Sequence, residues 1–177
     1  MSKNILVLAG SPRKGGNSDL LCEALMKGAQ EAGHRTEKVY LQELDIHPCM
    51  ACYGCRGTGK CVQHDRMADL LEKMVAADVL VLAKPVYFYA MDGQMKTMID
   101  RTLPRYREIA GKEFVFIATA AAGKQAMERT IDGLRGFTDC LPGALVKAVI
   151  YGEGMYQKGE VTDTPAWQEA YEAGRSL

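Results

Sequence analysis

The sequence lacks the features of membrane, fibrous and disordered proteins. Its longest apolar runs are about five to eight residues, far short of the roughly 20 that span a bilayer. The 18 Gly and 6 Pro among 177 residues are too few for a fibrous or disordered chain. The 22 basic residues equal the 22 acidic ones, so no global field favours nucleic acid or an anionic membrane. The first residues show no signal-peptide pattern, and a cytoplasmic protein without nucleic-acid or membrane partners is expected.

Apolar runs predict a buried parallel sheet. Four of them stand out, at residues 5–9, 79–83, 114–118 and 145–150, the last interrupted by Lys147. Continuous rather than alternating hydrophobicity is typical of strands covered on both faces. A weaker run at residues 38–41 is half polar and suits an edge strand.

Amphipathic patterns between these runs predict helices. The first begins with Asn17 or Ser18 as N-cap and stops at Gly33. Others follow at residues 67–75, at 95–99, around 127–134 and after Pro165. This alternation predicts one α/β domain over residues 1–177. Five strands at this spacing fit a flavodoxin-like, doubly wound parallel sheet of order 2-1-3-4-5, although periodicity alone does not give the order. A cysteine-rich loop at 47–64 and a C-terminal extension from about 152 to 177 complete the chain.

The loop after the first strand, Gly10–Ser18, has the composition of a phosphate site. Its glycines let the backbone fold close around an anion, and the following helix N-terminus offers unpaired N–H groups. Ser11, Asn17 and Ser18 add donors, and Arg13 can neutralise charge. The loop matches neither the Walker pattern nor the G-x-G-x-x-G fingerprint, which argues against a nucleoside triphosphate. A Gly-rich turn before a capped helix is the alternative.

Two further loops follow strands at the same edge of the predicted sheet. Residues 84–96 include Tyr87, Phe88 and Tyr89 in a row beside Pro85, which could line a planar aromatic ligand or simply pack under a helix. Residues 119–125 carry small side chains that would let a flat ring approach the backbone. Because the carboxyl ends of parallel strands meet at one edge, the three loops are expected to form one crevice.

The sequence resembles the flavodoxin-like NAD(P)H-dependent FMN reductase family. The matching segments are GSPRKGGNS at 10–18, PVYFY at 85–89 and GQMKTMIDR at 93–101. The resemblance implies that the FMN phosphate is held by Ser11, Arg13, Asn17 and Ser18. It implies that the ribityl chain and ring contact Pro85, Val86, Tyr87 and Phe88. More loosely, it places the other ring edge near Ala121, Ala122 and Gly123.

The resemblance also implies the chemistry. The flavin would accept hydride and pass electrons on, so no catalytic side chain is expected. Electrons would come from NAD(P)H or a reduced ferredoxin-like protein and go to a quinone, another small acceptor or a protein. A dedicated electron carrier without a small-molecule substrate is the alternative to this NAD(P)H-dependent FMN or quinone-type reductase. Relatives of this kind often pair with FMN near the subunit boundary, so a homodimer or homotetramer is expected.

Four of the six cysteines crowd into thirteen residues as Cys49-x2-Cys52-x2-Cys55-x5-Cys61. Four thiolates on a short glycine-containing loop can wrap a cubane cluster, and C-x2-C-x2-C opens the ferredoxin pattern. The spacing resembles that of the iron-sulfur flavoproteins of the same fold family, which implies that these four cysteines are ligands of a [4Fe-4S] cluster. A tetrahedral zinc site, a thiol/disulfide pair such as Cys52 and Cys55, and unmetallated thiols remain alternatives. The other two cysteines, Cys22 and Cys140, are expected to be small core residues.

Overall fold

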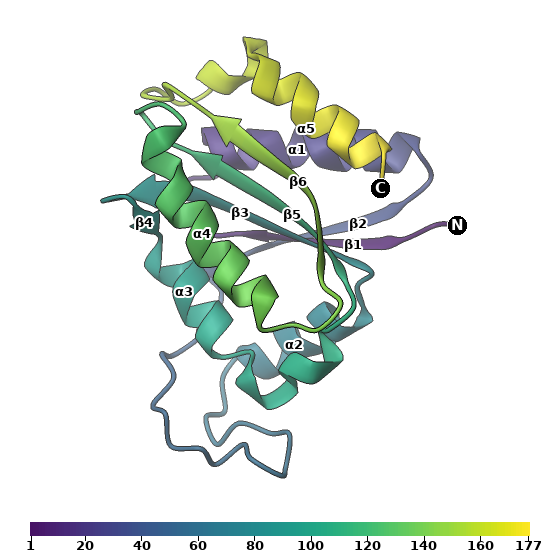
Figure 1. Cartoon of the computed structure of the whole chain (residues 1–177), viewed down its shortest axis with the longest axis vertical. Helices are drawn as coiled ribbons and strands as arrows, with labels where there is room; N and C mark the ends of the chain where they lie inside the picture. Colours follow the sequence, from purple (N-terminus) through teal and green to yellow (C-terminus); the bar gives the residue numbers. More distant parts are fainter.

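A parallel sheet lies at the centre of the structure, a computed structural model that describes residues 1–177 (Figure 1). The strands are β1 (Asn4–Ala9), β2 (Arg35–Tyr40), β3 (Val79–Tyr87), β4 (Ala90–Met91), β5 (Glu113–Thr119) and β6 (Leu145–Gly152). Five of them are parallel in the order β2-β1-β3-β5-β6, which confirms the expected flavodoxin-like order. The sheet has six strands rather than five, because Ala90 and Met91 fold back and pair antiparallel with Tyr87 and Val86.

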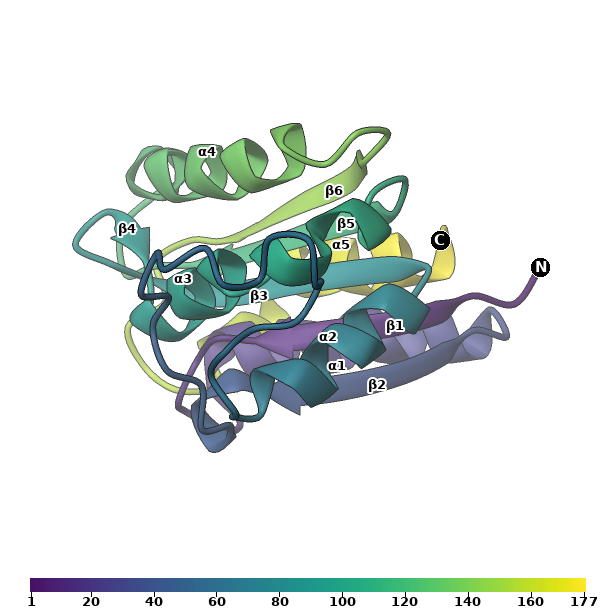
Figure 2. The same cartoon turned by 90° about the horizontal axis from the view of Figure 1, so that it is seen from below.

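The five α-helices cover both faces of the sheet. They are α1 (Asn17–Glu31), α2 (Met67–Ala76), α3 (Gly93–Asp100), α4 (Gln125–Asp139) and α5 (Pro165–Arg175), with short 3-10 turns at Leu41–Glu43, Leu103–Glu108 and Glu160–Asp163. Helices α1 and α5 lie on one face, and α2, α3 and α4 lie on the other (Figures 1 and 2). None of these helices has the length and apolar character needed to cross a bilayer.

Alternate residues of the strands contribute their side chains to two separate apolar cores. Side chains such as Val7 and Val81 pack with Leu25 against α1 and α5. Their neighbours, including Leu8 and Leu82, pack against α2, α3 and α4. Both faces of the central strands are therefore buried, which is why their sequences are continuously apolar.

The apolar run that ends in β6 is interrupted by Lys147 for a local structural reason. Phe114 of β5 pairs with Val146, and the next β5 residue, Val115, pairs with Ala148. Lys147 is therefore the extra residue of a β-bulge, and its exposed side chain reaches to 3.7 Å from Glu113.

The two helices of the first face approach each other unusually closely. A β-carbon added at Gly28 of α1 would lie 2.1 Å from the Tyr171 carbonyl oxygen. One added at Gly174 of α5 would lie 2.0 Å from the Leu25 carbonyl oxygen. Only glycine permits this contact, which fixes the C-terminal helix on α1.

Four details differ from the sequence predictions. The N-cap of α1 is Gly16, so Asn17 and Ser18 lie inside the first turn, while Gly33 ends the helix region with φ +88° as expected. Strand β3 continues to Tyr87, because its last residues pair with β5 and β4. The α2–α4 face holds a fully buried Lys84 that hydrophobicity did not indicate. Cys22 is buried as expected, but Cys140, at the C-cap of α4, is exposed.

Candidate functional site

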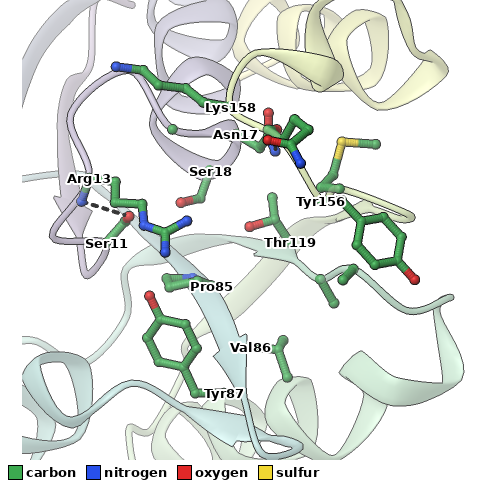
Figure 3. A pocket seen from close by; sticks show the side chains of 15 residues that line it. Ser11, Arg13, Asn17, Ser18, Pro85, Val86, Tyr87, Thr119, Tyr156 and Lys158 are labelled. Carbon is green, nitrogen blue, oxygen red and sulfur yellow. Dashed lines mark hydrogen bonds between the residues drawn. The ribbon is translucent and has the colours of Figure 1, made fainter.

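A cavity of about 250 Å³ opens at the carboxyl ends of β1, β3 and β5 (Figure 3). The loops after these three strands line it, as the sequence predicts for one crevice. The sequence-predicted residues that it brings together are Ser11, Arg13, Asn17, Ser18, Pro85, Val86, Tyr87 and Ala121. The lining also includes Gly16, Thr119 and Ala120 of the expected loops, and a segment that the sequence analysis did not single out: Met155, Tyr156, Gln157 and Lys158.

The first wall is the turn between β1 and α1. Ser11 and Ser18 are almost wholly buried and face the cavity, while Arg13 is exposed at its rim. Ser11 Oγ accepts the Arg13 amide at 3.2 Å. The first-turn amides of α1 have no partner within the helix, and its N-terminus carries partial positive charge. This wall therefore suits an anion.

A buried carboxylate braces that turn from behind. Asp19 accepts the Gly15 amide at 2.7 Å and the Tyr40 hydroxyl at 3.2 Å. Its second oxygen accepts Lys38 Nζ at 2.7 Å, with both side chains largely buried. The charge of Asp19 is thus neutralised by Lys38, and the turn keeps its shape without placing a free carboxylate in the cavity.

The segment before α5 forms a wall that the sequence analysis missed. The Asn17 side chain donates to the Gln157 carbonyl at 2.7 Å and accepts the Gly159 amide at 3.0 Å. These two hydrogen bonds, called here the Asn17 strap, hold residues 155–158 over the cavity. Lys158 then lies against Gly15, where an added β-carbon would be 3.1 Å from its Nζ. Lys158 is therefore a second cationic side chain in the cavity lining, in addition to Arg13.

The aromatic residues after Pro85 divide between the cavity and solvent. Tyr87 lines the cavity, but Phe88 does not and is completely exposed. Phe88 and Tyr89 have φ of 49° and 60°, a left-handed conformation that is uncommon for aromatic residues. Both residues lie in the tight turn that leads into β4, and Tyr89 is exposed beside Arg129 of α4.

The residues of the third loop, 119–125, line two different hollows. Ala121 lines the cavity, whereas Ala122 and Gly123 line a neighbouring hollow with Tyr89, Gln125, Ala126 and Arg129. The Lys124 amide at the start of α4 donates to Glu153 at 2.8 Å. The loop is therefore tied to the end of β6.

The cysteine loop extends beyond the layer of α2 and α3 (Figure 1). Its four cysteines are free thiols, with Cys49 and Cys52 exposed and Cys55 and Cys61 half-buried. They do not converge: the structure has no group of three or more His, Cys, Asp or Glu side chains arranged to hold a metal ion. The donor set itself, four thiols within one short loop, has the composition that an iron-sulfur cluster requires.

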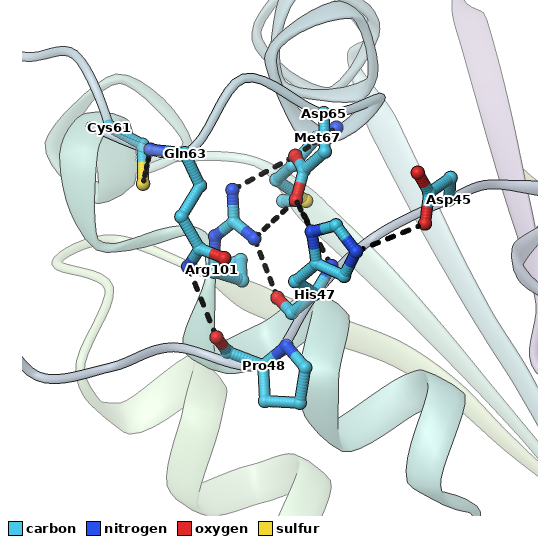
Figure 4. Close-up of polar contacts among 8 residues, drawn as sticks. All are labelled: Asp45, His47, Pro48, Cys61, Gln63, Asp65, Met67 and Arg101. Atoms are coloured by element: carbon cyan, nitrogen blue, oxygen red, sulfur yellow. Dashed lines mark hydrogen bonds and ion pairs between the residues drawn. The ribbon is translucent and has the colours of Figure 1, made fainter.

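A buried ion pair anchors the end of this loop (Figure 4). Arg101, at the end of α3, donates to both oxygens of Asp65 at 2.6 and 2.9 Å, and to the His47 carbonyl at 2.6 Å. Each charged side chain is 1% exposed. Burial alone would raise the pKa of Asp65, but hydrogen bonds from Arg101 and from the His47 and Met67 amides outweigh it and lower that pKa. The pair closes the base of the loop against the domain.

Comparison with known proteins decides the family. The NADPH-dependent FMN reductase family matches residues 3–154. The chain belongs to this family. The iron-sulfur flavoprotein of Methanosarcina thermophila is 36% identical over 130 residues, covering 72% of this chain and 68% of that protein. An iron-sulfur flavoprotein of Methanocaldococcus jannaschii is 32% identical over 135 residues, covering 75% and 70%.

Solved structures agree on the fold of this FMN reductase family member. An azoreductase from Bacillus anthracis superposes over the full length of both chains with a TM-score of 0.78 and 18% identity. At that identity the match shows the fold alone. The family assignment confirms the expected class, an FMN-dependent oxidoreductase that uses NAD(P)H.

Proposed function

We propose that the cavity at the carboxyl ends of β1, β3 and β5 holds FMN, with its phosphate at the turn before α1. The observation that carries this proposal is the meeting of three loops at one cavity whose anion-suited wall faces apolar and aromatic side chains. When bound, FMN would supply the hydride and electron chemistry of the reaction.

The residues of the chain then bind and orient the group. Ser11, Arg13 and Ser18 hold the phosphate together with first-turn amides, including that of Asn17, whose side chain is engaged with residues 157–161. Pro85, Val86, Tyr87 and Ala121 contact the ribityl chain and ring. Phe88, Ala122 and Gly123 lie beyond the cavity lining, so their contacts with the ring require that it extend past the rim.

The phosphate assignment is tested with two ligands and two variants. Arg13→Met removes a charge-assisted hydrogen bond, for which a loss of about 1.5–3 kcal/mol, or about 10- to 140-fold in FMN affinity, is expected. Riboflavin lacks the phosphate, so its affinity should not change. Lys14→Met is the matched control, because Lys14 is exposed, pairs with Glu43 and does not line the cavity. Equal losses for FMN and riboflavin, measured by flavin fluorescence quenching, would refute the phosphate site.

We also propose that Cys49, Cys52, Cys55 and Cys61 bind a [4Fe-4S] cluster. Support comes from their number and thiol chemistry and from the names of the two relatives above. The thiols are apart in the structure, so the loop must fold around a cluster. Ala51, Tyr53, Gly57 and Gly59 have positive φ, which gives this short segment several sharp bends.

Anaerobic purification with iron and acid-labile sulfide assays tests the cluster. About four irons and four sulfides per chain are expected, lost in Cys52→Ser and retained in Cys140→Ser, a control that removes another exposed thiol. Zinc instead of iron, a Cys52–Cys55 disulfide or four free thiols would each exclude the cluster.

The electron donor and the assembly complete the proposal. We propose that NAD(P)H reduces the flavin and that a quinone or other small acceptor reoxidises it. Rapid NAD(P)H turnover supports the reductase, whereas slow turnover with rapid reduction by a ferredoxin-like protein would support the electron carrier. The exposed, conformationally strained Phe88 and Tyr89 suit a homodimer or homotetramer. Light scattering on the chain and on Phe88→Asp tests that assembly.

A further inference from the structure

Lys84 is a fully buried lysine on the central strand, with 0% of its surface exposed. It shares a sheet face with Leu80 and Leu82, which belong to the core against α2, α3 and α4. The only hydrogen bond of its side chain runs from Nζ to the Ala90 carbonyl, at 3.4 Å. A buried ammonium normally needs a closer set of partners, so this position is costly for the charged form.

Asp92 is a second buried ionisable side chain near Lys84, and it is 2% exposed. Its Oδ1 accepts the Met95 amide at 2.9 Å and caps α3, while Oδ2 has no hydrogen-bond partner. The carboxylate packs against Gly10, where an added β-carbon would lie 2.6 Å from Oδ2 and 2.8 Å from Oδ1. Glycine at position 10 is what admits the carboxylate.

The two groups sit directly behind the cavity. Gly10 precedes Ser11, and Lys84 precedes Pro85, and both Ser11 and Pro85 line the cavity. The buried residues that β1, β5, α3 and α4 contribute to this face include Leu8, Ala118, Met95 and Met127, all apolar. The charged residues of α3, Lys96 and Asp100, pair with each other in solvent, and Glu128 of α4 meets Tyr151. Asp92 is the charged group that acts on Lys84.

The energetics follow from this placement. Burial lowers the pKa of Lys84 from 10.5 to about 7, with the Asp92 charge opposing the shift. Burial also raises the pKa of Asp92. Lys84 therefore has a pKa near neutral pH and lies next to the cavity that is proposed to bind FMN.

We propose that Lys84, supported by Asp92, takes up a proton from water when negative charge enters the cavity. The inference rests on the proposed FMN site, where the phosphate and then flavin reduction add negative charge. The lone pair of Lys84 Nζ forms the new N–H bond, and a water or buffer acid gives up the proton. Lys84 is neither oxidised nor reduced, because the electrons come from NAD(P)H. The new ammonium compensates the added negative charge. Lys84 thus balances charge beside the cavity and is not a catalytic residue.

The first test uses the apoprotein with lysine labelled at Cε. One lysine signal should titrate near pH 7, disappear in Lys84→Met and persist in Lys96→Met, a matched exposed control on α3. Asp92→Asn keeps an acceptor for the Met95 amide but removes the charge, so the same signal should titrate at lower pH. A Lys84 signal that titrates near pH 10 would overturn the inference. If Lys84→Met does not fold, the direction in which Asp92→Asn shifts the titration of this signal tests the inference instead.

The second test counts protons on the FMN-loaded protein. At pH 8, one unit above its pKa, Lys84 is about 90% neutral. FMN binding and two-electron reduction together should therefore take up as much as about 0.9 proton more in wild type than in Lys84→Met. Equal counts would overturn the inference. A chain that takes up no FMN would instead refute the proposed function, and the proton count would then be made with inorganic phosphate.

Discussion

The base of the cysteine loop is predicted to depend on the Arg101–Asp65 ion pair. Asp65→Asn preserves the size of the side chain but leaves the Arg101 guanidinium buried without its counter-charge. Arg101 Nε already lacks a hydrogen-bond partner, so the remaining donors have little room to find new acceptors. Breaking a buried pair in this way typically costs about 3–5 kcal/mol of unfolding free energy.

Urea unfolding measures this loss, and a surface pair provides the control. Arg66 and Asp69 lie 3.2 Å apart in solvent, and Asp69→Asn should cost less than about 1 kcal/mol. The loop itself can be followed by trypsin, because Arg56 and Lys60 are exposed within it. Cleavage after these residues should speed up in Asp65→Asn and stay unchanged in Asp69→Asn. If the two variants lose similar stability, or the loop is cut no faster, the anchoring argument is wrong.

The same pair predicts a response to acid. The pKa of Asp65 is lowered on folding, so its contribution is complete above the unfolded pKa of about 4. It is lost as the pH falls through the lower folded value. The unfolding free energy of wild type should therefore decline more steeply in acid than that of Asp65→Asn, and parallel curves would contradict the lowered pKa.

Three further predictions concern other parts of the molecule. Gly174→Ala should destabilise the chain by about 1–3 kcal/mol, because its methyl group would meet the Leu25 carbonyl; thermal unfolding against Gly136→Ala, an open position on α4, checks this. Lys84 binds its proton less well in the folded chain than in the unfolded chain. The unfolding free energy of wild type, measured by urea titration, should therefore rise between pH 7 and 10 by as much as about 4 kcal/mol relative to that of Lys84→Met. A difference between the two proteins that stays constant with pH would contradict this. Asn17→Ala should detach residues 155–158 from α1, because it removes both hydrogen bonds of the Asn17 strap. The expected results are weaker FMN binding and faster tryptic cleavage after Lys158, and unchanged cleavage would show that the strap is dispensable.

The parts of the fold predicted from the sequence are those with a local physical signature. Continuous runs such as 79–83 identify strands buried on both faces, and the register places their carboxyl ends together. The loops that follow then have to meet, so the cavity was predictable without knowing any contact. Eight of the proposed FMN-binding residues line it for this reason.

The parts that the sequence did not indicate depend on contacts between distant residues. Nothing in Met155–Lys158 identifies a cavity wall, because its position comes from the Asn17 strap 140 positions earlier in the chain. Lys84 was inconspicuous because lysine is usually a surface residue, and Asp92 becomes its partner only once the turn after β3 folds back. The spacing of the cysteines predicts possible ligands but not whether their sulfur atoms meet.

The C-terminal helix consequently belongs to the candidate site, although it contributes no side chain to the cavity. Gly28 and Gly174 let α5 settle on α1, the same helix whose first turn forms the anion wall. The segment before α5 must then cross the mouth of the cavity, where Asn17 holds it and Lys158 adds positive charge. Close packing at one end of α1 thus fixes the geometry at the other, because a rigid helix joins them.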